Sequence, residues 1–185
     1  MPIRFKEIKK YLARNVRLSI CFEDGFYHNY LMVSDITDTE YDSLYVYGIG
    51  MIDVEFSMDV YVDQHKMDGV GLSLRDNSLF PAIEIVLHEE ARDIERSTDE
   101  MLLFKDLKPY LQRFGGYFSV VNREDWSFEL YKIRDDIPDK YDNMYVYGIG
   151  MEDNPTIEEP IIRKMEYDTY QKKKFVIVLS DKPRE

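Results

Sequence analysis

An eleven-residue block that occurs twice constrains the fold of this chain more than any other feature. The first copy, YDSLYVYGIGM, occupies residues 41–51, and the second, YDNMYVYGIGM, occupies residues 141–151. Nine of the eleven positions are identical, and the two that differ keep their polar or apolar character. Such a match within 185 residues indicates that the chain consists of two copies of one unit.

The similarity extends on both sides of the block. Upstream, FKEIKKYLAR at 5–14 aligns with FKDLKPYLQR at 104–113. Downstream, IVL occurs at 85–87 and again at 177–179. Each of these two segments leads into a charged tail that contains one arginine, Arg92 or Arg184.

The extent of the alignment predicts a first repeat unit at 1–93, a joint at 94–101 and a second repeat unit at 102–185. Units of this size are near the lower limit for an independent hydrophobic core. We therefore expect the two units to pack on each other as a pseudo-dimer.

Each copy is predicted to contain a short helix followed by an antiparallel sheet, which is an α+β arrangement. Ile8, Tyr11 and Leu12 are spaced as on one face of a helix, and Pro109 weakens the same prediction in the second copy. Apolar alternation in the first copy predicts strands at residues 17–22 and 27–33, in the repeated block at 41–51, and at 83–87.

The third predicted strand carries the repeated tyrosines and glycines. Strict alternation places Tyr45, Tyr47, Ile49 and Met51 on one side of it and the glycines on the other. Core packing is the expected role of the tyrosines, with partner contact as the alternative. The glycines indicate a bulge or a close backbone approach rather than a phosphate loop, because the third glycine of that motif is missing. The residues with an expected structural role are Gly48, Gly50, Gly148, Gly150, Tyr45, Tyr47, Tyr145 and Tyr147.

The net charge is −12, and it is unevenly distributed. Between residues 35 and 76 the chain has ten acidic residues against Lys66 and Arg75. Such a segment repels nucleic acid and attracts basic surfaces, so we expect no direct binding of duplex DNA. The alternative is that the acidity serves solubility alone. Trp126, the only tryptophan, lies beside a predicted turn, where exposure would make it an interface anchor. The predicted partner-binding residues are Asp35, Asp38, Glu40, Asp42, Asp53, Glu55, Asp59 and Trp126.

The composition also predicts where the protein is located. The single cysteine, Cys21, excludes an intramolecular disulfide and fits a reducing compartment. No apolar stretch approaches eighteen residues, and no charged leader precedes an apolar one. We therefore expect neither a membrane span nor a secretion signal, and a cytoplasmic location.

No strong catalytic, metal or cofactor motif is recognisable in the chain. The loop residues Asp59, Asp63, His65 and Asp68 carry suitable ligand atoms, but their spacing matches no calcium or zinc motif. We therefore expect no metal and no cofactor, and a binding protein rather than an enzyme.

The pattern IKKYL, then YDxxYVYGIGM, then IVL resembles small acidic proteins carried on mobile elements of Gram-positive bacteria. Some of these are anti-CRISPR proteins that inhibit the type II-A RNA-guided nuclease. The resemblance covers most of both copies, and no catalytic residue carries over from it. It implies an inhibitor that binds this effector nuclease directly, with or without guide RNA, in the cytoplasm of the bacterial host. Because the nuclease holds guide and target in positively charged channels, an acidic protein would fit there as a nucleic-acid mimic.

Three other functions stay open at this point. The first is an intrinsic or accessory nuclease activity that truncates the guide RNA. The second is another acidic binding module, such as a toxin-neutralising or anti-restriction protein. The third is a metal-dependent hydrolase, which needs carboxylates that converge in one pocket. The oligomeric state is open as well.

Overall fold

The computed structural model describes residues 2–30, 32–36, 39–55, 79–97, 101–112, 116–152 and 174–184. The elements of the first copy are α1 (Phe5–Lys9), β1 (Leu18–Phe22), β2 (Tyr27–Tyr30), the 3₁₀ helix η1 (Val33–Asp35), β3 (Tyr45–Glu55) and β4 (Leu79–His88). Those of the second copy are α3 (Phe104–Leu107), η2 (Lys108–Tyr110), β5 (Tyr117–Asn122), β6 (Phe128–Tyr131), η3 (Arg134–Asp136), η4 (Asp139–Tyr141), β7 (Tyr145–Glu152) and β8 (Lys174–Ser180).

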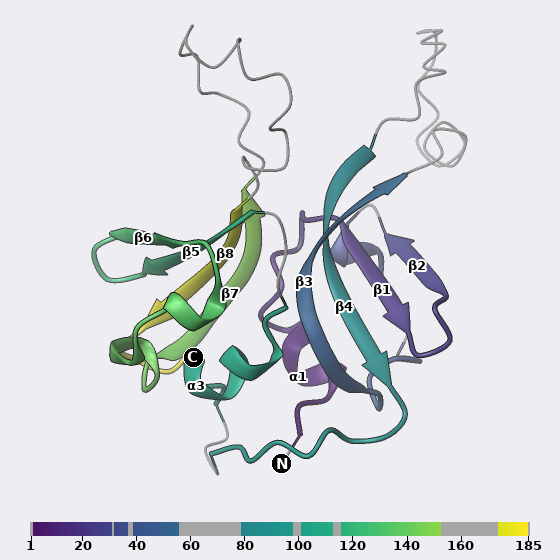
Figure 1. The fold of residues 1–185 in the computed structure, drawn as a ribbon, viewed down its shortest axis with the longest axis horizontal. Helices are drawn as coiled ribbons and strands as arrows, with labels where there is room; N and C mark the ends of the chain where they lie inside the picture. The colour runs from purple at the N-terminus through teal and green to yellow at the C-terminus, as the bar shows by residue number, and fades with distance from the viewer. Residues whose placement is uncertain are drawn as a thin grey trace, which may run out of the picture.

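The two copies form sheets with the same strand order, which confirms the predicted duplication. The first sheet has the order β2-β1-β4-β3, and the second has the order β6-β5-β8-β7. Figure 1 shows the two sheets side by side, with the short helices α1 and α3 between them at one end.

The prediction of purely antiparallel sheets is wrong, because each sheet contains one parallel pair. Strand β1 pairs with β4 in parallel, whereas β1 with β2 and β3 with β4 are antiparallel. The second sheet repeats this arrangement, with β5 parallel to β8. Alternation in a sequence predicts that a strand exists but not which strands are its neighbours. Helical content is also small, so α+β describes the chain only loosely.

The repeated block forms a strand, but its side chains do not alternate as predicted. Between Val46 and Gly48 the pairing of β3 with β4 shifts register, so that Tyr47 lies in a β-bulge. As a result Val46 and Ile49 are both buried, while Tyr47 is only half-buried. Tyr45, Tyr141, Tyr145 and Tyr147 are half-buried as well, whereas Tyr41 at the start of the first block is buried. The second copy has the same register shift, between Val146 and Gly148.

Both predicted helices are present, but they are short. Helix α1 spans five residues and buries Ile8, and the chain beyond it buries Tyr11 and Leu12. In the second copy α3 ends at Leu107 and the chain continues as the 3₁₀ turn η2. Pro109 accounts for the difference, since it has no backbone N–H to continue an α-helix.

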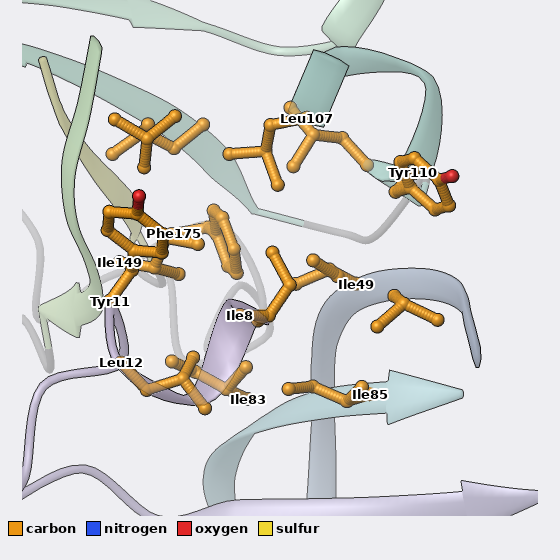
Figure 2. Close-up of a cluster of buried hydrophobic side chains, with 14 of the residues drawn as sticks. Ile8, Tyr11, Leu12, Ile49, Ile83, Ile85, Leu107, Tyr110, Ile149 and Phe175 are labelled. Carbon is orange, nitrogen blue, oxygen red and sulfur yellow. The ribbon is translucent and has the colours of Figure 1, made fainter. Parts of the chain in front are cut away.

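The two copies share one hydrophobic core, as a pseudo-dimer requires. Figure 2 shows Ile8, Leu12 and Ile49 of the first copy close to Ile149 and Phe175 of the second. All five belong to one continuous cluster of buried side chains. Neither copy therefore buries its apolar face without the other.

Each copy also adds a short extended segment to the edge of the other copy's sheet. The N–H of Ala13 donates to the carbonyl of Ile149 on β7 at 2.8 Å, and the Ile149 N–H donates to the carbonyl of Tyr11 at 2.8 Å. In the reciprocal contact, the Gln112 N–H donates to the carbonyl of Ile49 on β3 at 2.8 Å. The edges of β3 and β7 are thus partly covered by the other copy.

Two buried tyrosines connect the copies in the same reciprocal way. The Tyr11 hydroxyl accepts a hydrogen bond from the Leu102 N–H at 3.3 Å, and the Tyr110 hydroxyl accepts one from the Ile3 N–H at 3.3 Å. Since Tyr11 aligns with Tyr110, the two bonds are equivalent in the duplicated fold.

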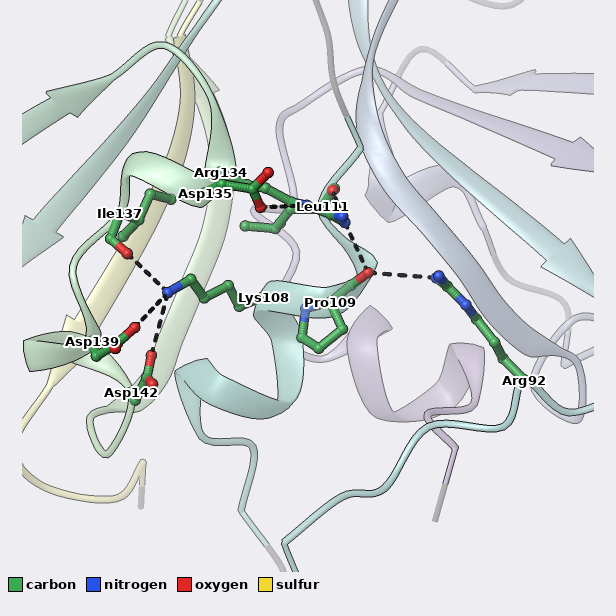
Figure 3. A network of polar contacts seen from close by, with 9 residues as sticks. All are labelled: Arg92, Lys108, Pro109, Leu111, Arg134, Asp135, Ile137, Asp139 and Asp142. Carbon is green, nitrogen blue, oxygen red and sulfur yellow. Dashed lines mark hydrogen bonds and ion pairs between the residues drawn. The ribbon is translucent and has the colours of Figure 1, made fainter.

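The arginine in the tail of each copy bridges the same junction. Arg92 Nη1 donates to the carbonyl of Tyr47 in its own copy at 2.9 Å and to that of Pro109 in the other copy at 3.4 Å (Figure 3 shows the second contact). The equivalent acceptors of Arg184 Nη1 are the carbonyls of Lys10, at 2.7 Å, and Tyr147, at 3.4 Å. The aligned tails therefore have equivalent structural roles.

Candidate functional site

A groove of about 1580 Å³ lies between residues 9–16 of the first copy and the sheet of the second copy. Its floor is the sheet face that points away from the core, with Val121 on β5 and Val176 and Val178 on β8. The hairpin of β5 and β6 contributes Trp126 and Phe128. Because both copies supply lining residues, the groove depends on their association.

The groove is basic, although the chain as a whole has 36 acidic and 24 basic residues. Among the described residues that line it, Asp42 is the only acid, and Lys9 Nζ lies 4.0 Å from a carboxylate oxygen of Asp42. The lining cations are Lys6, Lys9, Lys10, Arg14, Lys174 and Arg184. A concave surface with one sign of charge concentrates ions of the opposite sign. The groove therefore favours an anionic ligand.

Aromatic rings lie next to basic side chains in the groove and beside it. The guanidinium of Arg123 is 3.9 Å from the centroid of the Tyr147 ring, and that of Arg184 is 5.6 Å from it. On the other side of the groove floor, Lys174 Nζ is 5.9 Å from the centroid of Phe128. Cation–π contacts of this length favour the positive groups at the ring faces. The cations are thus held close to planar apolar surfaces.

Trp126 has a left-handed backbone conformation, and the residue at the same place in the first copy's hairpin is a glycine. Gly25 and Trp126 each lie two residues before the second strand of their sheet, and their φ angles are 84° and 58°. For a residue with a side chain, this left-handed region costs roughly 1–2 kcal/mol. The Trp126 side chain is nevertheless 69% exposed, so it does not recover this cost through core packing. Strain of this kind at an exposed residue points to a function rather than to folding.

The duplicated fold contains an equivalent groove on the first sheet, but that groove is smaller, about 690 Å³. Gln112 reaches over Gly48 there, and a Cβ atom on Gly48 would lie only 1.9 Å from its Nε2. In the larger groove, Ala13 takes the place of Gln112, and its Cβ is 3.6 Å from a Cβ placed on Gly150. A small side chain at this position keeps the larger groove open.

A second residue also narrows the smaller groove. Arg134 Nη1 donates to the carbonyls of Pro109 at 3.1 Å and Leu111 at 3.0 Å, as Figure 3 shows. The side chain of Arg134 is thereby fixed against the segment that enters the first sheet. Arg134 lines the smaller groove, and its guanidinium binds these backbone carbonyls.

The face of the first sheet also differs in chemistry from the apolar floor of the larger groove. Glu84 occupies the position of Val176, since their strands pair in equivalent registers. Burial raises the pKa of the Glu84 carboxyl above its usual value. A hydrogen bond with Cys21, together with burial and the nearby Glu84, raises the pKa of Tyr27 to about 12.

The acidic residues predicted to bind a partner have separate environments near the start of β3. Asp35 is exposed, and its carboxylate accepts a hydrogen bond from the Met32 N–H at 3.0 Å. Glu40 is exposed, whereas Asp42 is half-buried beside Lys9. The second copy has an ion pair equivalent to the last one, between Lys108 and Asp142 at 3.7 Å (Figure 3).

The remaining acids of this group are not brought to the same place. Asp53 is near the other end of β3 from Asp42, a separation of roughly 30 Å at the usual rise of a strand. Asp38, Asp59 and the side chain of Glu55 lie outside the described residues. The described acids therefore do not form one continuous patch, and Trp126 belongs to the basic groove instead.

The tyrosines of the first repeated block contact polar neighbours at the sheet end. The Tyr45 hydroxyl accepts a hydrogen bond from Arg4 Nη2 at 3.1 Å. The Tyr47 ring stacks on His88 with 3.7 Å between ring centroids, and Glu23 lies 3.4 Å from His88. In the second copy the guanidinium of Arg123 lies over the Tyr147 ring, and Glu124 accepts a hydrogen bond from the Ser180 hydroxyl at 2.7 Å.

No group of three histidine, cysteine, aspartate or glutamate side chains converges as a metal site within the described part of the chain. The loop residues considered above, Asp59, Asp63, His65 and Asp68, lie outside that part. None of the helices that the structure describes is long and apolar enough to cross a membrane.

Sequence reasoning missed the basic groove, although two signals for it were present. Lys6, Lys10 and Arg14 are spaced four residues apart in a region with few acids. The alignment of the two hairpins places Trp126 opposite Gly25, a substitution that a purely structural turn would not favour.

Comparison of the chain with protein family models, with curated proteins and with solved structures finds no match.

Proposed function

We propose that this protein is an anti-CRISPR inhibitor that binds a type II-A RNA-guided nuclease directly. The observation that carries the proposal is the excess of ten acids over two cations between residues 35 and 76. Nucleases of this class hold their guide and target in positively charged channels, to which such a segment is complementary. The resemblance of the repeated motifs to mobile-element anti-CRISPR proteins supports the same partner.

Several carboxylates have to act together in this mechanism. An exposed ion pair contributes only about 0–1 kcal/mol, so substitution of one acid has a small effect. Asp35 and Asp42 also have partners within the fold, and their replacement would disturb local structure. Glu40 is exposed, and the test combines it with Asp38, which lies outside the described residues.

The test compares two double variants with the same change of charge. Asp38→Lys/Glu40→Lys alters the acidic segment, and Glu89→Lys/Glu90→Lys alters two exposed acids after β4 as a matched control. Inhibition of target DNA cleavage by the guide-loaded nuclease should weaken in the first variant and persist in the control. Association of the parent protein with the nuclease should also slow between about 50 and 500 mM salt, because screening shortens the range of the attraction. Equal inhibition by both variants and the parent, or binding that ignores salt, would refute the proposal.

The same reactions give a further readout on the guide RNA. After incubation with nuclease and inhibitor, the guide should run at full length on a denaturing gel. A shortened guide would show that inhibition involves cleavage of the guide RNA in the complex and not binding alone.

A further inference from the structure

We infer that the basic groove binds a single-stranded polynucleotide, RNA or DNA. Apart from Asp42, the charged residues that line it lie outside the acidic segment on which the proposed function rests. It is formed by Lys6, Lys10, Arg14, Trp126, Phe128 and Arg184 over an apolar floor.

The cations suit the phosphate groups of such a strand. Lys6, Lys10 and Arg14 are exposed and follow one another along the first copy's side of the groove. Lysine neutralises a phosphate as a point charge, and arginine can bind it in a bidentate way. Asp42 is the only acid among the described lining residues, and its closest cation is Lys9 at 4.0 Å.

The aromatic side chains suit the bases. Trp126 and Phe128 are 69% and 59% exposed and lie on the hairpin beside the groove. A cationic groove with exposed rings is the usual platform for single strands, because every base has a flat face that can stack. The left-handed φ of Trp126 adds an independent argument, since glycine occupies the equivalent turn without strain.

The comparison between the copies shows that the open groove is not a by-product of the fold. The equivalent site on the first sheet is narrowed by Gln112, and the face of that sheet has Glu84 at the position of Val176. The ring of His88 stacks on the bulge tyrosine of the first copy, whereas the guanidinium of Arg123 lies over the bulge tyrosine that lines the open groove. Every one of these differences makes the open groove wider, more apolar or more basic.

A single strand fits these features better than a duplex or an acidic peptide. In a duplex the bases stack on one another and do not reach the rings of Trp126 and Phe128. A long duplex is also repelled by the net charge of −12. An acidic peptide would use the cations but would leave the two exposed rings without flat partners.

Trp126 provides a direct assay, because it is the only tryptophan in the chain. Oligouridine and oligothymidine of about twelve nucleotides should quench its fluorescence on titration, consistent with the site size of single-strand grooves. With three phosphate contacts, affinity should fall about twentyfold between 50 and 200 mM salt. The oligonucleotide that binds with the higher affinity shows whether the groove prefers RNA or DNA.

Matched variants test the location of the site by anisotropy of a labelled oligonucleotide. Trp126→Gly should weaken binding about fivefold or more while the urea midpoint stays the same or rises, since glycine fits the turn. Lys6→Glu should weaken binding severalfold, whereas Lys105→Glu, at the aligned and exposed position outside the groove, should not.

Several outcomes would overturn the inference. They are unchanged affinity of Trp126→Gly, equal effects of the two lysine variants, tighter binding of a duplex of the same length, and no binding at 50 mM salt. Quenching by an oligoglutamate peptide but not by the oligonucleotides would assign the groove to an acidic peptide instead. Because these assays contain no nuclease, their failure is separate from a failure of the proposed inhibition.

Discussion

Replacement of Gly48 by alanine should destabilise the protein, whereas the same replacement at the equivalent Gly148 should stabilise it slightly. Both glycines follow the bulge tyrosine of an identical motif, and neither has a positive φ. They differ in what lies above them. A Cβ on Gly48 would be 1.9 Å from Nε2, 2.3 Å from Cδ and 2.7 Å from Cγ of Gln112, whereas the nearest atom to a Cβ on Gly148 is 3.9 Å away.

The magnitudes follow from these distances. All three contacts at Gly48 are shorter than any real Cβ contact, so the Gln112 side chain has to leave its position. Overpacking costs about 1–3 kcal/mol, and the lower end of this range applies here because Nε2, Cδ and Cγ belong to the flexible side chain of a half-buried glutamine. Exchange of a strand glycine for alanine returns about 0.5–1 kcal/mol, mostly by restricting the unfolded chain. We therefore expect a net loss of about 0.5 kcal/mol for Gly48→Ala and a gain of about 0.5 kcal/mol for Gly148→Ala.

Urea denaturation followed by far-UV circular dichroism measures both changes. The Gln112→Ala background supplies the decisive control, because the second copy's groove already has Ala13 in that place. In this background Gly48→Ala should no longer destabilise, which gives a coupling energy of about 1 kcal/mol. The explanation by side-chain overlap would be refuted if the stability changed with the same sign at the two glycines. It would also be refuted if Gln112→Ala did not remove the loss of stability caused by Gly48→Ala.

Other parts of the structure give three further expectations, all measured by urea denaturation. Arg92→Met should cost about 1–3 kcal/mol, because the part-buried guanidinium bridges Tyr47 and Pro109 of different copies, and Arg184→Met should cost less since Arg184 is exposed. Glu84→Gln should stabilise the protein at pH 7, because burial raises the folded-state pKa of Glu84, and this gain should vanish as the pH falls below the usual value of 4.5. Glu7→Gln should destabilise at pH 7: burial raises the pKa of Glu7, but hydrogen bonds from the Arg4 N–H and Arg96 lower it further, so the parent's advantage is lost as the pH falls through the folded-state pKa. A stability difference that does not change with pH would contradict either glutamate prediction.

Features that depend on local pattern were predictable from the sequence. The duplication, the short helices and the positions of the strands follow from repeated letters and from apolar spacing. The bulge at Tyr47 was not predictable, because the alternation of side chains within a strand gives no sign of an inserted residue. The order of strands was missed for a similar reason, since β1 and β4 become neighbours only through contacts distant in the sequence.

The candidate site was harder to predict because it depends on the exchange between copies. Residues 11–13 show no strand pattern of their own and become extended by pairing with β7. That pairing brings Lys10 and Arg14 to the sheet that carries Trp126 and Phe128. Net charge pointed instead to an acidic surface, because an average over the chain conceals a local excess of the opposite sign.

Duplication explains how one small fold can carry two sheet faces of different chemistry. The core, the exchanged segments and the bridging arginines are equivalent in the two copies, since each stabilises the association on which both depend. The outer sheet faces and their surroundings are not bound by this requirement, and there the copies differ at several positions: glutamate against valine, glutamine against alanine, glycine against tryptophan. If the open groove binds a single strand and the acidic segment binds a basic channel, the two sites would together match a nuclease that holds a nucleic acid. An inhibitor with both sites should therefore bind the guide-loaded nuclease more tightly than the guide-free form, and Trp126→Gly should reduce that preference without changing affinity for the guide-free form. If the parent binds the guide-loaded and guide-free forms with equal affinity, the groove does not take part in the inhibition.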